Sequence, residues 1–307
     1  MPEWKPPTQA EVESYFARLN NWGRWGDDDQ RGTLNLITPE KRATAVALAR
    51  SGRVVSLARD LTPQPTVNYH MLHPVRRGQS QAAVDYVGMI YHGVTVTHMD
   101  ALCHVEYQGK LYNGRSFEDN VRFGGAKWGA LDVWFDGVVT RGVLLDVAAA
   151  REEGYVKAGK PVTPPELDAA AARARVTVEP GDFVVVRSGR EAYENAMTKA
   201  APLSATQSLS NVDARPGLHI SCLVWLREHD VAGIAWDMLD ERPVGYGMDF
   251  GVHLGIPLLG LCLIDNADPE RLVTVCAEEN RGEFLFVAMP LRIAGSTGSP
   301  CQPVAIF

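Results

Sequence analysis

The fold of this chain is constrained most by an alternation of short apolar, β-branched runs with helical segments through its second half. Runs of this length and composition are typical of buried strands. The predicted strands lie within residues 141–148, 179–189, 231–237 and 283–294. Between the first two, Thr163 and Glu166 form a capping box around two prolines that open a predicted helix over 164–174. Because strand–helix alternation is typical of α/β proteins, we predict a single compact α/β domain with a mixed β-sheet.

Three further helices are predicted, over residues 39–50, 221–229 and 269–280. Residues 1–38 contain an aromatic, glycine-rich and acidic segment without helical or strand periodicity, so we predict a loop-rich N-terminal extension. The proline-bearing residues 62–74 are also predicted to be a loop. The sequence contains no repeat and no linker, so residues 1–307 are predicted to form one domain.

The composition argues against several classes of protein. The chain has a formal net charge of −7, a pI near 5.6 and no basic run, so it lacks the electrostatic footprint of nucleic-acid binding. No stretch approaches the roughly 18 apolar residues of a membrane span, and the start lacks the pattern of a secretory signal. The five cysteines are scattered without a CxxC pair, which favours reduced thiols. We therefore expect a cytoplasmic protein that acts on a small molecule, with neither nucleic acid nor membrane as partner.

His98 and Asp100 carry the strongest chemical signal. They are two residues apart in a predicted strand within 86–105. On a strand both side chains leave the same face, with Cα atoms about 6.6 Å apart, so they can converge on one ion. An imidazole and a carboxylate suit zinc, manganese or iron, and His104, at the same parity, could be a ligand or a base. The spacing alone is equally compatible with a hydrogen-bonded His–Asp pair that shapes the end of a strand.

The surrounding sequence, HGVTVTHMDALCHVEYQGKLYNG, resembles the signature of the cyclase family, which includes bacterial kynurenine formamidases and isatin hydrolases. That signature is usually written His-x-Gly-Thr-His-x-Asp-x-Pro-x-His, and it is matched by Thr97, His98, Asp100 and His104. Three more segments look like the long-chain branch of the family, namely WGDDDQRGTLNLITPE, PGLHISCLVWLREHDVAGIAWD and PLRIAGSTGSP. The resemblance spans nearly the whole chain. It implies a cyclase-like hydrolase domain with a swivelling β/β/α fold that assembles as homodimers or homotetramers.

The resemblance also implies roles for individual residues. His98 and Asp100 would be metal ligands, and His104 would be the general acid/base that handles the proton of the leaving nitrogen. Family members supply a further His and an acidic residue from near the C-terminal third of the chain, and His253 and Asp265 look like these. Asp265 stands where Glu is usual, so its carboxylate reaches about one bond less far and would ligate through water or not at all.

Substrate contacts are expected from the same resemblance. Tyr69 and His70 lie in the region that resembles the substrate-facing loop of the family. Trp25 could stack on an aromatic substrate, although tryptophans in a glycine-rich loop also serve as packing anchors.

The chain departs from the signature where Val94 replaces the first ligand His and where Val96 replaces the usual Gly. His92 is a possible substitute, but six extended residues would separate it from His98 by about 20 Å, whereas ligand atoms on one ion lie within about 4 Å. Only a sharp bend could bring His92 in, and a β-branched residue at 96 disfavours one because positive φ is costly there. We therefore predict one divalent ion, zinc or manganese, in preference to two.

These observations predict a metal-dependent hydrolase that cleaves an amide C–N bond in a small cyclic or N-acylated, aromatic substrate. The missing ligand leaves open an alternative, a metal-independent cyclase, dehydratase or isomerase in which His104 and Asp100 act as acid and base. A third interpretation, a binding protein without chemistry, is disfavoured because Asp100 and His104 are retained. The chain has no glycine-rich phosphate loop and no GxSxG elbow, so nucleotide binding and serine hydrolase chemistry lack support.

Overall fold

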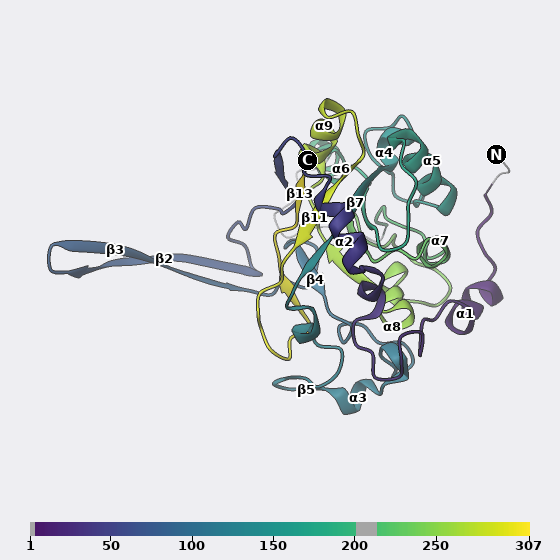
Figure 1. Cartoon of the computed structure of the whole chain (residues 1–307), viewed down its shortest axis with the longest axis horizontal. Helices are drawn as coiled ribbons and strands as arrows, with labels where there is room; N and C mark the ends of the chain where they lie inside the picture. The colour runs from purple at the N-terminus through teal and green to yellow at the C-terminus, as the bar shows by residue number, and fades with distance from the viewer. Residues whose placement is uncertain (1–3, 201–213) are drawn as a thin grey trace.

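Within the described residues, nine strands form one mixed sheet (Figure 1). The computed structural model describes residues 4–200 and 214–307. In spatial order the strands are β1 (Val54–Ser56), β13 (Val304–Ile306), β11 (Glu283–Ala288), β7 (Val138–Asp146), β8 (Phe183–Arg187), β9 (Gly233–Trp236), β10 (Cys262–Asp265), β4 (His98–Asp100) and β12 (Gly298–Pro300). The run from β7 to β10 is parallel, and the strands that flank it pair antiparallel. The predicted α/β class and mixed sheet are therefore confirmed.

The centre of the sheet is buried on both faces, as expected where parallel strands are covered by other elements. In β8 the side chains of residues 183–186 are fully buried, and all four residues of β9 are buried. The ring of Phe183 stacks on that of Phe286 in β11, with centroids 4.3 Å apart. Each of the five cysteines is free, in agreement with the predicted reduced thiols. The four strands predicted in the second half of the chain are confirmed as β7, β8, β9 and β11.

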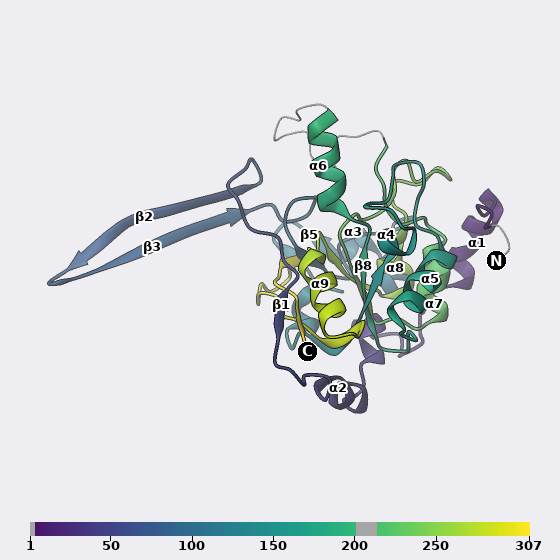
Figure 2. The ribbon, with the colours of Figure 1, turned by 90° about the horizontal axis from the view of Figure 1, so that it is seen from above.

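Most helices surround the sheet, whereas α6 (Arg190–Ala200) extends away from it (Figures 1 and 2). The others are α1 (Gln9–Arg18), α2 (Pro39–Val46), α3 (Phe117–Asn120), α4 (Val147–Ala150), α5 (Pro164–Ala174), α7 (Cys222–Glu228), α8 (Gly255–Leu259) and α9 (Glu270–Glu278). The four predicted helices are confirmed as α2, α5, α7 and α9, although α2 ends earlier than expected. The N-terminal extension contains α1, whose capping box of Thr8 and Glu11 is visible in the sequence. None of the described helices is long and apolar enough to cross a membrane.

The prediction of a loop over residues 62–74 is confirmed for residues 62–66 and wrong for residues 67–74. Strands β2 (Val67–Arg77) and β3 (Ser80–Met89) form an antiparallel hairpin that projects from the rest of the molecule (Figures 1 and 2). We call residues 67–89 the arm. The prolines do not prevent this strand, because Pro74 coincides with a shift in register, a position at which proline is tolerated in a sheet.

The strand predicted within residues 86–105 is correspondingly divided. Its first residues belong to β3 and its centre to β4, and the chain turns between them at residues 92–95. This turn determines which side chains lie beside the face of β4 that carries His98 and Asp100.

Candidate active site

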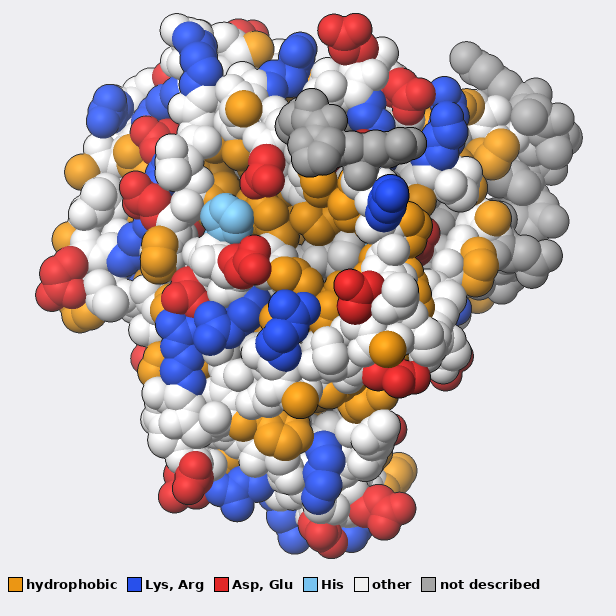
Figure 3. Space-filling view, turned by 90° about the vertical axis from the view of Figure 1, so that its right-hand side faces the viewer, with side chains coloured by type: hydrophobic (Ala, Val, Ile, Leu, Met, Phe, Trp, Pro, Cys, Tyr) orange, Lys and Arg blue, Asp and Glu red, His pale blue; other side chains and the backbone are white. Residues whose placement is uncertain are grey.

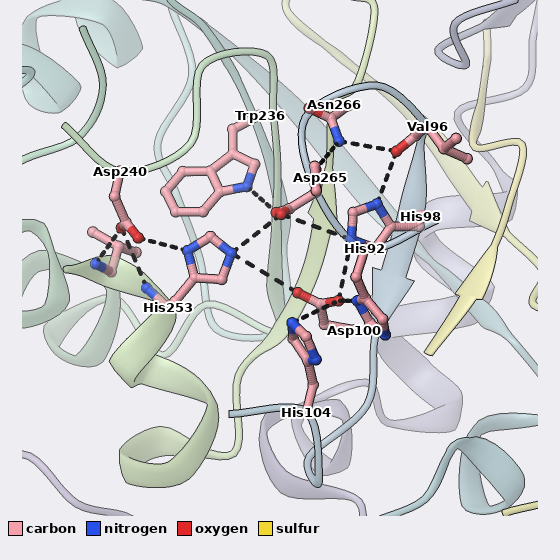
Figure 4. A network of polar contacts seen from close by, with 12 residues as sticks. His92, Val96, His98, Asp100, His104, Trp236, Asp240, His253, Asp265 and Asn266 are labelled. Carbon is pink, nitrogen blue, oxygen red and sulfur yellow. Dashed lines mark hydrogen bonds and ion pairs between the residues drawn. The ribbon is translucent and has the colours of Figure 1, made fainter. Parts of the chain in front are cut away.

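Strand β4 carries two residues of the signature, His98 and Asp100, on one face. His98 and Asp100 alternate with Met99, so their side chains point to the same side of the sheet. Strand β10 runs antiparallel to β4 with Asp265 directly opposite His98. Because opposite residues of an antiparallel pair share a face, the Asp265 carboxylate joins the other two side chains. All three are almost fully buried, and they converge in Figure 4.

His253 reaches the same place from the 3-10 helix η5 (Val252–Leu254). Its Nδ1 lies 2.7 Å from Oδ2 of Asp240, which fixes the ring. Its Nε2 then faces Oδ2 of Asp265 at 3.1 Å and Oδ2 of Asp100 at 3.9 Å. Burial opposes protonation of His253, but the carboxylates of Asp240 and Asp265 raise its pKa well above the usual value.

His92 also lies in the site, so the argument against a bend that would bring it there is wrong. The chain turns sharply through residues 92–95 immediately before β4. Gly93 adopts a φ of 132°, a conformation that glycine enters without steric cost. The glycine that permits the turn is therefore Gly93, three residues before the position of the glycine in the signature. Val96 occupies that position and does not obstruct the turn.

Buried polar side chains hold this bend. The side-chain amide of Asn266 donates to the carbonyl oxygens of Gly93 at 2.8 Å and Val96 at 2.9 Å. The guanidinium of Arg190 donates to the carbonyl oxygen of Val94 and to Oδ1 of Asn266. Val94 occupies the position where the signature has a ligand His, and there its backbone carbonyl accepts the hydrogen bond from Arg190. Because these partners are distant in sequence, the local sequence does not predict the bend.

Two imidazoles point a nitrogen at one carboxylate oxygen. Nδ1 of His92 is 3.0 Å and Nε2 of His98 is 3.3 Å from Oδ1 of Asp100. The other nitrogen of each ring is fixed elsewhere: Nε2 of His92 lies 3.0 Å from Oγ1 of Thr297, and Nδ1 of His98 lies 2.8 Å from the carbonyl oxygen of Val96. Histidines that bind metals show this arrangement, in which the second nitrogen orients the ring.

The Asp100 carboxylate indicates where a cation fits. It is fully buried, and neither of its oxygens has a hydrogen-bond partner among the described residues. Nδ1 of His92 also lacks a hydrogen-bond partner, because its short contact with Asp100 is not aligned as a hydrogen bond. A buried carboxylate without donors is strongly disfavoured unless a positive charge compensates it. The donor atoms of His92, His98 and Asp100 lie within 4.8 Å of one another, so a divalent ion fits this group.

Asp100 also belongs to a second candidate group, with His253 and Asp265. In that group the donor atoms of His253 and Asp265 are already engaged. Nε2 of His253 contacts Oδ2 of Asp265, and Nε1 of Trp236 donates to Oδ1 of Asp265 at 2.5 Å. The group that contains His92 is therefore the better site for a single ion.

His104 lies next to these ligands and, like His92, is partly exposed. Its Nε2 is 3.8 Å from Oδ1 of Asp100, and its side chain is 24% exposed. The ring stacks on that of His92, with centroids 3.8 Å apart and planes 6° apart. Burial lowers the pKa of His104 to about 4, helped by His92 and His253 and opposed by Asp100. His104 is therefore neutral at neutral pH, which is the form that can accept a proton, but a pKa this low makes it a weak base.

The charges of the group favour an ionised Asp100. Burial opposes its ionisation, but His104 and His98 hold the pKa of this carboxyl well below its usual range. Burial likewise disfavours the imidazolium of His98, whereas Asp100 and Asp265 raise its pKa to about 9. The carboxylate is therefore in its metal-binding form throughout the neutral range. We call the assembled side chains the site cluster: His92, His98, Asp100, His104, His253 and Asp265.

The predicted substrate-binding residues lie away from the site cluster. Tyr69 and His70 are on the arm, where each contacts another side chain of the arm. Trp25 lies in the N-terminal extension beneath the guanidinium of Arg24, 4.8 Å from its ring centroid. No described contact joins these three residues to the site cluster within one chain. Their role in substrate binding stays a prediction.

Sequence reasoning does not identify four residues that position the site cluster, namely Arg190, Asp240, Asn266 and Thr297. Two of them have a signal that could have found them: Asn266 follows Asp265 directly, and Thr297 lies within the GSTGSP segment. Arg190 and Asp240 belong to no such pattern, and only the fold brings them to the site.

Known proteins similar to this chain share its fold. The family model described as "Putative cyclase" matches residues 37–241. A crystal structure of a novel cyclase is similar with a TM-score of 0.84 and 29% sequence identity, over 95% of this chain and 99% of that chain. Isatin hydrolase A from Ralstonia solanacearum has a TM-score of 0.55 and 19% identity, over 86% and 95% of the two chains. An isatin hydrolase bound to the product analogue thioisatinate has a TM-score of 0.56 and 15% identity, over 88% and 99%. No curated protein matches the chain.

Proposed function

The chain belongs to the cyclase family, and from this premise we propose that it is a metal-dependent hydrolase that cleaves an amide C–N bond in a small cyclic or N-acylated aromatic substrate. One observation carries the proposal. The fully buried carboxylate of Asp100 lies between His92 and His98 and has no hydrogen-bond partner among the described residues. A cation is the simplest partner for such a group.

His92, His98 and Asp100 would hold one divalent ion, zinc or manganese. When bound, the ion supplies a water of lowered pKa and polarises the amide carbonyl. Two imidazoles and a carboxylate are a donor set that both metals accept. The chain orients these ligands in advance, because Thr297 and the carbonyl of Val96 fix the second nitrogen of each ring.

His104 would be the general acid and base. Hydrolysis adds water to the carbonyl carbon and breaks the C–N bond, so one proton must pass from the water to the leaving nitrogen. His104 is suited to carry it, because its neutral ring is fixed by stacking on His92 and is partly open to solvent. The products would be a carboxylic acid and an amine, joined in one molecule where the substrate is cyclic.

Aromatic side chains near the site cluster support an aromatic substrate. The ring of Tyr91 lies 6.0 Å from that of His98, and the ring of Phe250 lies 5.8 Å from that of His253. Such rings offer surfaces on which a flat substrate stacks. Three of the structures with a similar fold are named isatin hydrolases, which makes isatin a suitable first compound to test.

The proposal is tested with a panel of N-formyl anilines, isatins and cyclic imides, assayed with the metal-supplemented protein. We expect hydrolysis of at least one class, loss of turnover after exhaustive chelation, and recovery when zinc or manganese is restored. Turnover that survives chelation would instead support the metal-independent cyclase, dehydratase or isomerase that uses His104 and Asp100. Binding of panel members without turnover would support a binding protein.

Thr297→Val is expected to weaken metal binding roughly 10- to 100-fold, the usual effect of losing a partner that orients a ligand. Valine keeps the volume of threonine but cannot hydrogen-bond Nε2 of His92. The affinity is measured by competition with a chromophoric chelator, and Thr297→Ser is the matched control that restores the hydroxyl. Equal affinities for the valine and serine variants would show that Thr297 does not orient His92.

A further inference from the structure

A pocket of about 500 Å³ lies beside the site cluster. This volume is typical of sites for small molecules. Part of α1, residues 106–108 and residues 246–250 line the pocket, together with Leu254. Two of these walls also lead to the site cluster, because Leu254 directly follows His253 and residues 106–108 begin two positions after His104. We call this space the side pocket.

Contacts between segments that are distant in sequence hold the walls of the side pocket in place. The side-chain amide of Gln9 on α1 donates to the carbonyl oxygen of Tyr246 at 3.2 Å. The ring of Phe16, also on α1, stacks on the ring of Tyr107 with the centroids 3.6 Å apart. The N-terminal extension therefore forms one wall of a pocket next to the active site.

The side pocket is acidic. Glu13, Glu106 and Asp249 line it, and none of the three forms an ion pair with any residue that the structure describes. Gln9 donates to Glu13 and the backbone N–H of Gly109 donates to Glu106, but both donors are neutral. No Lys, Arg or His is among the described residues of its lining. By contrast, acidic and basic side chains are mixed over the side of the molecule that carries α1 (Figure 3).

Aromatic rings complete the walls of the side pocket. Tyr107, Tyr246 and Phe250 line it. The face of an aromatic ring is negative and attracts an ammonium ion, and carboxylates around the ring add to this attraction. The ring of Phe250 is 38% exposed and lies 5.8 Å from the ring of His253, so it borders both the site cluster and the side pocket. A flat substrate that stacks on Phe250 therefore extends from the site cluster into an acidic, aromatic space.

We propose that the side pocket binds a positively charged group of the substrate, carried on the aromatic part beyond the scissile amide. The inference rests on the proposed function and narrows its substrates to those with an ammonium or amidinium substituent. The aromatic rings contact the cation, and Glu13, Glu106 and Asp249 compensate its charge. A substituent with a negative charge is disfavoured, because it would lie among three unpaired carboxylates.

Three N-formyl anilines test the proposal on the metal-loaded full chain. They differ only in the para substituent, which is trimethylammoniomethyl, its uncharged isostere neopentyl, or carboxymethyl. The cationic compound is expected to have a kcat/KM at least about 10-fold above that of the neopentyl compound, and the anionic compound is expected to have the lowest value. Added salt is expected to reduce the preference for the cation, because interactions of exposed carboxylates are screened.

The double variant Glu106→Gln/Asp249→Asn removes two of the charges and keeps the shapes of both side chains. It is expected to lower the ratio of the cationic to the neopentyl kcat/KM at least about 3-fold. Glu152→Gln is the matched control and should keep the wild-type ratio, because Glu152 is exposed and follows α4, outside the side pocket. A wild type without preference for the cation, or a double variant that keeps the full preference, would overturn the proposal and leave the proposed function standing.

If none of the three compounds is hydrolysed, the proposed function fails for this class of substrate. The side pocket is then tested by calorimetric titration of the same proteins with phenyltrimethylammonium. Binding by the wild type that the double variant weakens at least about 3-fold would support a cation site in the side pocket. Absence of binding, or equal binding by both proteins, would overturn it.

Discussion

Asp100→Asn is expected to lower turnover by roughly 10³-fold or more and to remove stoichiometric metal binding. The substitution keeps the shape of the side chain but deletes the charge that lies against both His92 and His98. The effect is measured as kcat/KM on the substrate found in the panel, together with elemental analysis of the purified variant.

Thermal unfolding gives a second readout of the same substitution. Chelation is expected to lower the melting temperature of the wild type, because it leaves the buried Asp100 carboxylate without its cation. Asp100→Asn should show no such decrease. Asp85→Asn, on the arm, is the matched control and should respond to chelation as the wild type does. An Asp100→Asn variant that binds metal and turns over normally would remove Asp100 from the site.

His104→Ala is expected to lower turnover about 10²- to 10⁴-fold while metal content stays at the wild-type level. The ring contacts His92 and Asp100 but is not needed as a ligand in the group of His92, His98 and Asp100. The measurement is kcat on the metal-loaded variant, beside a metal determination on the same sample.

His229→Ala controls for the loss of a histidine, because His229 follows α7 and stacks on Trp225, away from the site cluster. It should match the wild type in both quantities. If His104→Ala retained full turnover, the proton of the leaving nitrogen would have to be carried by another group. If it lost the metal, His104 would be a ligand.

The elements that the sequence predicts correctly are those whose signals are local. β8 and β9 are continuous apolar runs because both of their faces are buried, and α5 is marked by its capping box. The shared face of His98 and Asp100 follows from the two-residue period of a strand alone. His253 and Asp265 are expected through the family resemblance, and the fold brings both to the same place.

The predictions that fail depend on contacts between distant residues. The bend that brings in His92 is held by Asn266 and Arg190, which lie far along the chain. The conformation of Val96 therefore does not decide whether the chain can turn, because Gly93 adopts the positive φ. Proline argues against a strand only inside a sheet, and the arm is a lone hairpin that carries Pro74 at a register shift. The prolines therefore do not indicate a loop at this place.

The first measurement to make is the metal content of the purified full chain, beside His92→Ala and His70→Ala purified in the same way. We predict about one equivalent of zinc or manganese per chain in the wild type and in His70→Ala, and a marked loss in His92→Ala, because His92 supplies one of the two nitrogens of the group around Asp100. Metal retained in full by His92→Ala, or no metal in the wild type even after it is supplied, would contradict the proposed site.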